Sequence, residues 1–444
     1  MKFLNLFKRK TITAIESKKT SEVFLANGLP EYTFVERRAI RRILDEYCGL
    51  KNRVILFLGY SKSGKTVYRK KYFENENDYE TCIYRCSCSS TIDQLYSQVE
   101  QRFSIPCKTA EGSSSSSHIN GEAGGNLSVP GVGMSYKMQT GLSDNHSTSR
   151  EYQRLKVDVN YICNYLCNKD SKVIILEDYH LVSSEFNSKF SEDLKHFIDE
   201  NILFVIIGIP SSPNRCFKHN PDLAGRSETI SFDYLEESEI KEMIQKGEEC
   251  LNVRFSDKVT DEIIKKSYKN AYLVQSICCE LLKTLEILET QKHTKKITDV
   301  NLIDTSCKIV SKKLNSEYKS IIQIIVEGAR SQRKDKVFNQ YEEIIKSIKN
   351  STIENLEKGL SYAEISRKTL DSFSVSTITH LVENKKYKSE ETFRNSVRGQ
   401  ISSALNNLEK NFDRAKARKI ILIEDKKLYL MDILFKFYLT WSDL

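Results

Sequence analysis

The apolar residues of this chain change their spacing several times, and each change marks a predicted element. Between Glu36 and Tyr47 they recur every three or four positions among arginines, which is the spacing of an amphipathic helix. Residues 53–58, Arg-Val-Ile-Leu-Phe-Leu, are an almost continuous apolar run, typical of a central parallel strand covered on both faces. The segment from Thr66 to Phe73 then opens another helix.

Further strands and helices alternate along the first half of the chain. Strands are predicted at 81–86, 172–176 and 202–207, and helices at 91–103 and 151–166. Strands that alternate with helices of this length indicate a parallel sheet with right-handed crossovers. We therefore expect an α/β domain built on a parallel sheet.

Residues 108–150 interrupt this alternation. They are rich in Gly, Ser and Asn, with five serines at 113–117, and hold too few apolar side chains to form a core. Residues 127–138 alternate loosely, which allows a small hairpin. Two interpretations stay open for this insertion: a disordered loop or a working recognition element.

The strand pattern ends at Ser231. A helical apolar stripe over 236–288 predicts a helical lid. Helices at 361–370 and 392–408, followed by two short strands within 419–430, predict a winged helix-turn-helix. The expected organisation is an N-terminal extension at 1–30, an ATPase domain at 31–230 that contains the insertion 108–150, a lid at 231–297 and a winged-helix domain at 298–444.

Composition narrows the class of protein. With 444 residues the chain is long enough for two or three domains, and no stretch reaches the roughly 20 apolar residues that span a bilayer. The first ten residues lack the apolar core of a secretory signal, so we expect a cytoplasmic protein whose 12 cysteines stay reduced. The net charge of +8 permits nucleic-acid binding without arguing for it.

The chemistry begins at residues 59–66, which read Gly-Tyr-Ser-Lys-Ser-Gly-Lys-Thr and follow the apolar strand. In such a loop the backbone N–H groups form an anion nest, Lys65 reaches the β- and γ-phosphates, and the Thr66 hydroxyl ligates magnesium. The predicted nucleotide-contacting residues are Gly59, Ser61, Lys62, Ser63, Gly64, Lys65, Thr66 and Val67.

A magnesium–triphosphate site also needs a carboxylate at the end of a neighbouring strand. Glu177 and Asp178 end the strand at 172–176, so we expect Thr66 and Glu177 on the metal side and Asp178 near the attacking water. In P-loop ATPases the usual order of these two acids is Asp then Glu. The shorter second acid favours slow turnover.

Three further groups of residues each carry two interpretations. Arg226 either neutralises charge on the γ-phosphate or is a surface arginine. Ser211 and Ser212 either sense that phosphate or shape a turn beside two prolines. The apolar residues before the first helix either cover the base or belong to the core; they are Tyr32, Phe34 and Val35.

Five stretches together resemble the STAND and AAA+ branch of ATPases, including bacterial origin-recognition-like and TniB-like proteins: 34–37, 59–66, 174–178, 207–209 and 221–226. The resemblance implies ATP and Mg²⁺ as ligands and a switch in which ATP exchange or hydrolysis rearranges the lid and winged helix. It also implies assembly into a homo-oligomer, and many such bacterial proteins act in phage defence. The chain departs from the pattern in its Glu-Asp order and in having Asn270-Ala271-Tyr272 where a Gly-x-Pro is common.

Three functions follow. The first is a regulatory switch whose output lies in an effector or sensor protein. The second is a DNA-binding initiator or transposition-helper ATPase, and the third is a scaffold that holds nucleotide without turnover. For the second, the residues expected to contact phosphates are Arg394, Arg398, Lys410, Lys416, Arg418 and Lys419.

Overall fold

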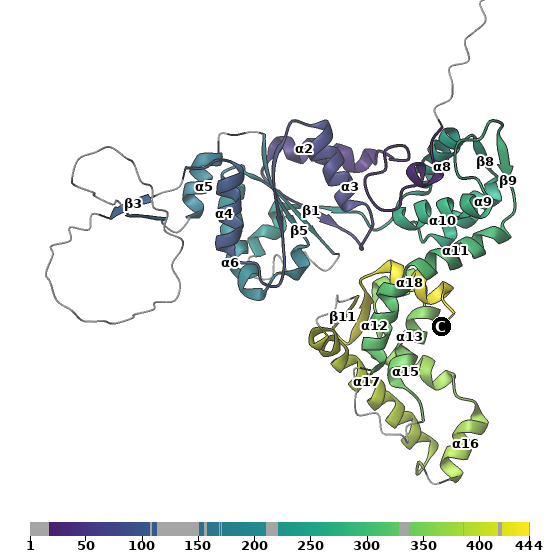
Figure 1. The fold of residues 1–444 in the computed structure, drawn as a ribbon. Coiled ribbons are helices and arrows are strands. Elements are labelled where there is room, and N and C mark those ends of the chain that lie inside the picture. Colours follow the sequence, from purple (N-terminus) through teal and green to yellow (C-terminus); the bar gives the residue numbers. More distant parts are fainter. Residues whose placement is uncertain are drawn as a thin grey trace, which may run out of the picture. The chain divides into compact units, whose positions relative to one another are not determined.

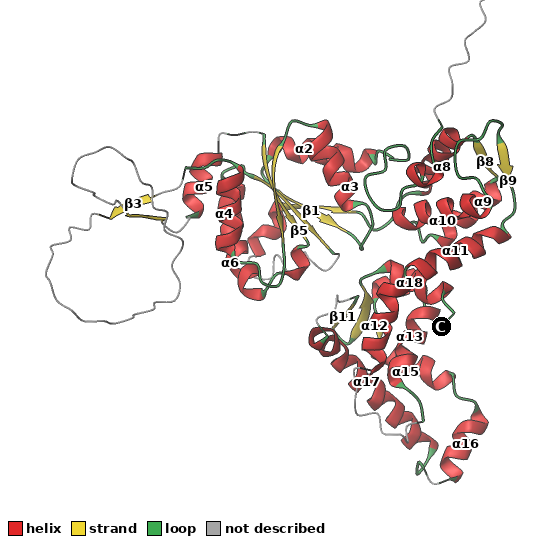
Figure 2. Cartoon of the chain, in the orientation of Figure 1, coloured by secondary structure: helices red, strands yellow, loops and turns green. Residues whose placement is uncertain are grey.

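The computed structural model describes residues 17–106, 109–112, 151–154, 158–167, 169, 171–209, 221–327, 337–384, 386–415 and 420–443. Two compact units emerge, and each is described by itself (Figures 1 and 2). The sheet unit consists of Arg42–Phe57 and Arg69–Ile230. The lid unit consists of Met1–Arg41, Leu58–Tyr68 and Ser231–Leu444.

The sheet unit is built on a five-stranded sheet with the order β2-β5-β6-β1-β7. Its strands are β1 (Val54–Leu58), β2 (Glu80–Arg85), β5 (Lys172–Glu177), β6 (Leu203–Gly208) and β7 (Ser227–Ser231). Strand β5 pairs in parallel with both β2 and β6. The predicted parallel sheet is confirmed. Strand β7 was missed because it holds a single buried apolar residue, Ile230, and so shows no apolar run.

The apolar runs read from the sequence occupy the centre of this sheet. Every residue of β1 and of β6 is buried, as expected for strands that have neighbours on both sides and helices above and below. Helices α4 (Ile92–Arg102) and α6 (Ser184–Asp199) lie together against one face (Figure 1). The switch in strand order beside β1 places the carboxyl ends of the strands where α/β proteins commonly bind ligands.

One predicted helix is partly wrong. Residues 151–166 were expected to be helical throughout, but β4 (Glu151–Arg154) pairs antiparallel with β3 (Thr109–Gly112). Helix α5 covers only Val159–Leu166 and begins after Asp158, whose side chain caps it. Pairing with a segment about 40 residues away overrides the local helical pattern. The hairpin expected at 127–138 lies outside the described residues.

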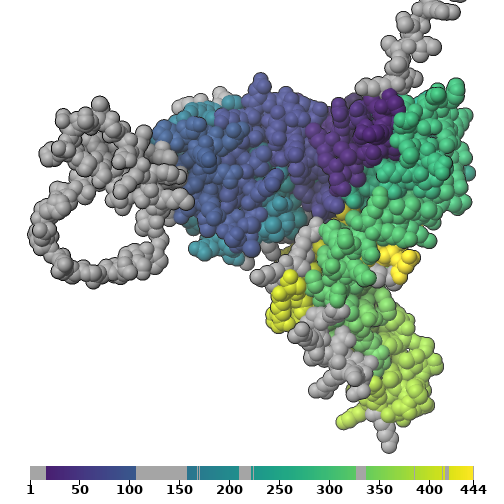
Figure 3. Space-filling model, in the orientation of Figure 1, coloured from purple at the N-terminus to yellow at the C-terminus, as the bar shows by residue number. Residues whose placement is uncertain are grey.

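In the lid unit, an N-terminal segment packs on the lid helices. Helix α1 (Thr20–Val23) lies against α8 (Glu237–Leu251) and α10 (Ala271–Thr284), and the Thr20 hydroxyl donates to the Ile287 carbonyl at 2.7 Å. Figure 3 shows this purple segment beside the green lid. Helices α9 (Asp257–Lys266) and α11 (Asn301–Lys313) complete the bundle.

The prediction that the lid contains no strands is wrong. Strands β8 (Val253–Phe255) and β9 (Lys295–Ile297) form a short parallel pair within the lid. Each contains only three residues, too few for a period to be recognised in the sequence. The helices predicted for 236–288 are confirmed.

The remaining elements of the lid unit are helical apart from a small sheet of order β10-β12-β11. They are α12 (Asn315–Glu327), α13 (Gln340–Asn350), α14 (Ile353–Lys358), β10 (Leu360–Ser361), α15 (Tyr362–Asp371), α16 (Val375–Glu383), α17 (Glu390–Arg414), β11 (Ile421–Glu424), β12 (Lys427–Leu430) and α18 (Ile433–Trp441). The two predicted helices and the hairpin are therefore present. Asp425 and Lys426 make the tight turn with positive φ values of 48° and 55°.

Among the described residues, every helix is too short or too polar to cross a membrane.

Candidate nucleotide-binding site

The phosphate loop lies in the lid unit, between Leu58 and helix α3 (Lys65–Arg69). The Lys65 ammonium donates to the backbone carbonyls of Gly59 and Tyr60, each at 2.6 Å. It also lies 3.4 Å from the Ser63 hydroxyl. The lysine thus folds over its own loop.

Two features explain why the loop needs its glycines: backbone conformation at one and close packing at the other. Gly64 has a φ of +97°, a conformation that side chains rarely adopt. A Cβ on Gly59 would lie 2.8 Å from the Ser63 hydroxyl and 3.0 Å from the Phe232 side chain. Glycine is therefore required at both ends of the loop, once for backbone conformation and once for close packing.

Aromatic residues hold the start of α3 against the segment that precedes α2 (Arg38–Leu50). The Tyr68 ring lies 6.1 Å from that of Phe34 and 5.6 Å from that of Phe232. The Tyr68 hydroxyl donates to the Glu36 carboxylate at 2.7 Å. Burial and this carboxylate raise the pKa of Tyr68. Phe34, which was expected either to cover the base or to belong to the core, packs on protein in this structure.

Arg37 joins the same segment to the lid. Its guanidinium donates to the Tyr234 carbonyl at 2.8 Å, pairs with Glu239 at 3.3 Å and lies 5.5 Å from the centre of the Phe232 ring. Arg37 thus links the segment that precedes α2 to helix α8. Of the other two candidate base contacts, Val35 is buried, whereas Tyr32 is half-buried with the Lys18 ammonium 4.2 Å from its ring.

The phosphate loop also touches the lid through its variable positions. The ring of Tyr60 lies 6.2 Å from the ring of Tyr234, and the Lys62 ammonium lies 4.3 Å from the ring of Tyr272. The Tyr234 hydroxyl in turn donates to the carboxylate of Glu357 in α14. Burial raises the pKa of Tyr60, and the charge of Glu357 adds to this effect. A continuous path of contacts therefore runs from the loop to α14.

Asp233 is a residue near the loop that sequence reasoning missed. Its carboxylate accepts from the Ser231 hydroxyl at 2.8 Å. Burial raises the pKa of Asp233, while the Ser231 hydrogen bond and the positive charge of Lys65 oppose this rise. Nothing in the sequence marks this residue, because it follows the unpredicted strand β7 and meets the loop only in the folded chain.

The acidic residues expected to serve magnesium lie in the sheet unit. Glu177 ends β5 and is buried, and its carboxylate lies 3.0 Å from the Arg69 guanidinium and 3.5 Å from that of Arg85. Asp178 is exposed and has a positive φ of 55°. The predicted metal partners Thr66 and Glu177 belong to different units, so their joint role remains a prediction.

The other candidate residues are placed as follows. Arg226 ends the 3₁₀-helix Pro221–Arg226 and forms an ion pair with Asp199 of α6. Ser211 and Ser212 lie outside the described residues. Within the described ranges, no group of three or more His, Cys, Asp or Glu side chains is arranged to hold a metal ion.

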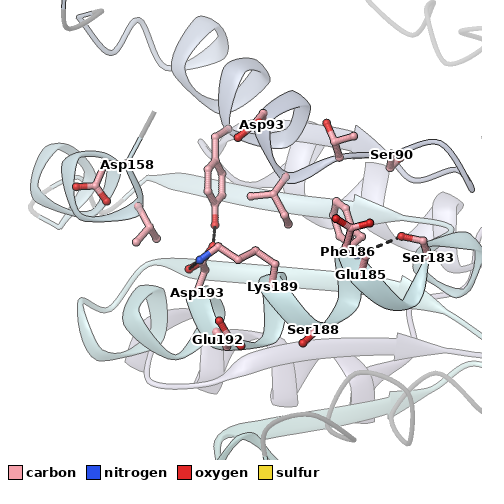
Figure 4. Close-up of a pocket in the computed structure, with 14 residues that line it drawn as sticks. Ser90, Asp93, Asp158, Ser183, Glu185, Phe186, Ser188, Lys189, Glu192 and Asp193 are labelled. Atoms are coloured by element: carbon pink, nitrogen blue, oxygen red, sulfur yellow. Dashed lines mark hydrogen bonds and ion pairs between the residues drawn. The ribbon is translucent and has the colours of Figure 1, made fainter. Parts of the chain in front are cut away.

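A separate cavity of about 1070 Å³ lies in the sheet unit where α4, α5 and α6 begin (Figure 4). The Tyr96 hydroxyl donates to the buried Asp193 carboxylate at 2.5 Å, and Lys189 lies 3.3 Å from the same group. Lys189 is the single basic side chain among the cavity's described lining residues, against five acidic ones: Asp93, Asp158, Glu185, Glu192 and Asp193. An excess of carboxylates in such a lining disfavours the binding of phosphates.

No family model matches the chain. No curated protein matches it either. Solved structures that resemble it include Cdc6p from Pyrobaculum aerophilum, with 13% identity, a TM-score of 0.40, and coverage of 94% of this chain and 96% of that one. The Walker-type ATPase paby2304 of Pyrococcus abyssi has 12% identity, a TM-score of 0.47, and coverage of 91% and 96%. The RuvB Holliday junction branch migration motor of Thermotoga maritima has 11% identity, a TM-score of 0.34, and coverage of 93% and 97%.

The fold assignment rests on the chain itself. The chain combines two features. Its parallel sheet switches strand order beside β1, where such sheets commonly bind ligands, and a GxxxxGKT segment directly follows β1. The chain therefore has the α/β fold of P-loop nucleotide-binding proteins.

Proposed function

We propose that this protein is an ATP-binding switch, with slow hydrolysis, that passes the state of its nucleotide to a protein partner. The observation that carries the proposal is the path from Tyr60 in the phosphate loop through Tyr234 to Glu357 in α14. A nucleotide that reshapes the loop must alter this path, because its first ring belongs to the loop. The conformation of the lid and of the elements beyond it therefore depends on which nucleotide the site holds.

The position of Lys65 gives the switch two forms. In the described form its ammonium is bound to the carbonyls of Gly59 and Tyr60. Binding of a triphosphate moves the ammonium to the phosphates, where a charge-assisted hydrogen bond is stronger than one to a neutral carbonyl. A ligand shifts an equilibrium only by its differential affinity for the two forms, and this exchange of partners supplies such a difference.

Residue types at the site fit magnesium. Thr66 offers a hydroxyl, and Glu177 and Asp178 offer carboxylates, all hard oxygen ligands of the kind this ion prefers. When bound, the ion would neutralise charge on the phosphates. The proposed roles are Thr66 and Glu177 at the metal and Asp178 near water. The hydrolytic role of Arg226 requires release from Asp199.

The proposal is tested with purified protein and two readouts. Binding of fluorescent ADP and ATP analogues is measured first, and phosphate release second, with Lys65→Ala as the blank. Tight binding with slow release, both lost in the blank, supports a switch. Binding with no release at all supports a scaffold instead. Absence of binding in correctly folded protein overturns the nucleotide function.

The partner of the switch is sought in a second experiment. Cross-linking and mass measurement in ADP and in ATP analogue would show whether copies of this chain assemble in one state only. A nucleotide-dependent homo-oligomer is the expected result, since the resemblance to AAA+ and STAND proteins implies assembly. A role in phage defence is part of the same proposal and would appear as a plating defect of phage on cells that carry the wild type but not Lys65→Ala.

DNA binding is the second candidate, and a specific groove favours it. Helices α15 and α17 border a hollow of about 530 Å³ that Arg367, Arg394 and Arg398 line. Arg394 forms an ion pair with Glu390 at 2.7 Å. Of the other basic candidates, Lys410 is exposed on α17, and Lys416, Arg418 and Lys419 lie outside the described residues. Three guanidiniums and one carboxylate, Asp371, are among the lining residues, and this excess of positive charge suits phosphates.

Salt dependence separates the two candidates. If the groove contacts a DNA backbone, log affinity falls linearly with log salt, and Arg398→Ala lowers the slope by about 1. Arg254→Ala, which removes an arginine of the lid, is the matched control. DNA that neither binds nor stimulates phosphate release leaves the switch as the surviving proposal.

A further inference from the structure

Lys62, in the middle of the phosphate loop, has a backbone conformation that lysine rarely adopts. Its φ is +57°, in the left-handed region that glycine favours. For a residue with a side chain this conformation costs free energy, and residues held in it cluster at functional sites. The contacts of the Lys62 side chain therefore deserve a functional explanation.

The Lys62 side chain reaches the lid. Its ammonium lies 4.3 Å from the centre of the Tyr272 ring, which belongs to the first turn of α10. A cation is attracted to the face of an aromatic ring, and the attraction is weak at an exposed position such as this one. Within the part of the chain that the structure describes, no carboxylate forms an ion pair with Lys62. Its ammonium can therefore leave the ring for an anion at little cost.

Tyr272 follows directly on a turn that contacts the last helix, α18. The turn spans residues 267–270 and ends at the residue that caps α10. Within it, the Tyr268 ring lies 6.4 Å from the ring of Phe437, and the Tyr268 hydroxyl lies 3.2 Å from that of Thr440. The phosphate loop and α18 thus contact one short segment of the lid, residues 267–272.

We infer that Lys62 is the residue by which the site distinguishes a triphosphate from a diphosphate. Its ammonium lies on the Tyr272 ring in the described form and moves to the γ-phosphate when a triphosphate binds. The inference rests on the proposed nucleotide function and deepens it, because it names the residue that binds the third phosphate. Loss of the Lys62 contact frees the start of α10, and the turn before it passes this change to α18.

The strengths of the two contacts favour this exchange. A charge-assisted hydrogen bond to a phosphate is stronger than the attraction of an exposed ammonium for a ring. Lys65 and the backbone N–H groups of the loop serve the phosphates of either nucleotide. A γ-phosphate adds negative charge, which a second ammonium neutralises. The exchange of partners by Lys62 then supplies a difference in affinity between the two forms of the lid.

The first test compares affinities for ADP and for a non-hydrolysable ATP analogue by isothermal titration into the full-length protein. Lys62→Asn removes the ammonium but keeps a residue that tolerates a left-handed backbone, so it should weaken binding of the ATP analogue and leave ADP affinity unchanged. Lys62→Arg keeps the charge and should retain the preference for triphosphate. Lys426→Asn, the same replacement at an exposed position with a φ of 55°, is the matched control and should change nothing.

The second test removes the ring. Tyr272→Leu should raise affinity for the ATP analogue by about 2–5-fold, because Lys62 no longer has a competing contact, and should leave ADP affinity unchanged. Tyr272→Phe keeps the ring face and should behave as the wild type. In the Lys62→Asn background, Tyr272→Leu should have no effect. A persistent effect in that background, or an equal change for ADP, overturns the inference.

A further comparison excludes an effect of Tyr272 on the nucleotide base. Inorganic tripolyphosphate and pyrophosphate differ in phosphate number and have no base. Tyr272→Leu should strengthen binding of tripolyphosphate and leave binding of pyrophosphate unchanged. Equal changes for the two probes would contradict a role in counting phosphates.

The third test follows α18 directly. Trp441 is the single tryptophan of the sequence, and its ring lies 6.4 Å from that of Phe437, so its fluorescence reports on α18. The ATP analogue should change the emission of the wild type, ADP should not, and Lys62→Asn should lose the response at saturating analogue. An equal response in wild type and Lys62→Asn overturns the coupling. Thermal unfolding of each variant separates these effects from misfolding.

The outcomes also separate this inference from the proposed function. If correctly folded wild type binds neither ADP nor the ATP analogue, the nucleotide function is overturned and the inference falls with it. If both ligands bind, and Lys62→Asn leaves both affinities unchanged, the inference about Lys62 fails alone.

Discussion

The ring of Tyr60, in the phosphate loop, lies 6.2 Å from the ring of Tyr234, in the segment that leads into the lid. The hydroxyl of Tyr234 is bound to Glu357, so one tyrosine contacts both the loop and α14. This arrangement makes the loop sensitive to events at α14, and it makes α14 sensitive to nucleotide. The first prediction follows from it.

Tyr234→Phe and Glu357→Ala should each raise the affinity for ADP. The bond between them helps hold the loop in the form in which Lys65 is folded onto its own carbonyls, and a hydrogen bond of this kind is worth about 0.5–1.5 kcal/mol, or roughly 2–10-fold in affinity. The double variant should show no more than either single one. Isothermal titration measures the ADP affinity of all three variants. If the effects of the two single variants add up in the double variant, the two residues act independently.

Lys65→Ala should weaken binding of ATP and ADP by about 10–100-fold. A hydrogen bond to a charged group contributes about 1.5–3 kcal/mol, and the variant removes this contact with the phosphates. Lys71→Ala, six positions further along the chain, removes an ammonium that pairs with Glu76 at 3.4 Å and is the matched control. If both variants bind equally well in a fluorescence titration, the loop does not hold phosphate.

Gly59→Ala should destabilise the protein by about 1–3 kcal/mol and weaken nucleotide binding, because the new methyl group would overlap Ser63 and Phe232. Gly399→Ala is the control. It lies in the interior of α17 with nothing within 4 Å of the added carbon, so it should raise stability by about 0.5–1 kcal/mol. Calorimetric unfolding reports both changes, and effects of the same sign would contradict the assignment.

Lys436 should make the stability of the protein depend on alkaline pH. Burial lowers the pKa of this lysine to about 8, and the charges of Lys349 and Lys368 act in the same direction. Below pH 8 the lysine is charged in the folded and unfolded chain alike. Between pH 8 and about 10.4 the unfolded chain binds the extra proton, so the free energy of unfolding rises with pH.

The measurement compares the wild type with Lys436→Met from pH 7 to pH 10. The wild type should gain about 1–3 kcal/mol relative to the variant over this range. Lys410→Met, at an exposed position of α17, should show no such trend. A difference that stays constant with pH would show that Lys436 keeps its ordinary pKa in the folded chain.

Expectations from local pattern were confirmed where one segment carries the whole signal. The apolar runs that became β1 and β6 are buried at every residue, because a strand with neighbours on both sides needs no polar face. The hairpin after α17 was equally visible, since β11 and β12 are separated by only two residues. The phosphate loop is local as well, and its spacing alone indicates its chemistry.

Relationships between distant segments were not predictable. Strand β7 was not predicted, and residues 151–154 were predicted to be helical. Pairing with other strands, and not the spacing of their own apolar residues, decides the conformation of both segments. Asp233 reaches the neighbourhood of Lys65 only because the chain returns to the loop after β7. The arginine partners of Glu177 come from a helix and a strand more than 90 positions earlier.

The sequence by itself determined that the chain holds a phosphate loop after a buried strand, and that an alternating α/β region precedes a helical one. Only the tertiary structure decided what those residues touch: Glu177 bound by Arg69 and Arg85, and the loop linked through Tyr234 to Glu357. The physical reason is that periodicity encodes which face of an element is buried, whereas charge pairing and ring contacts depend on which elements become neighbours.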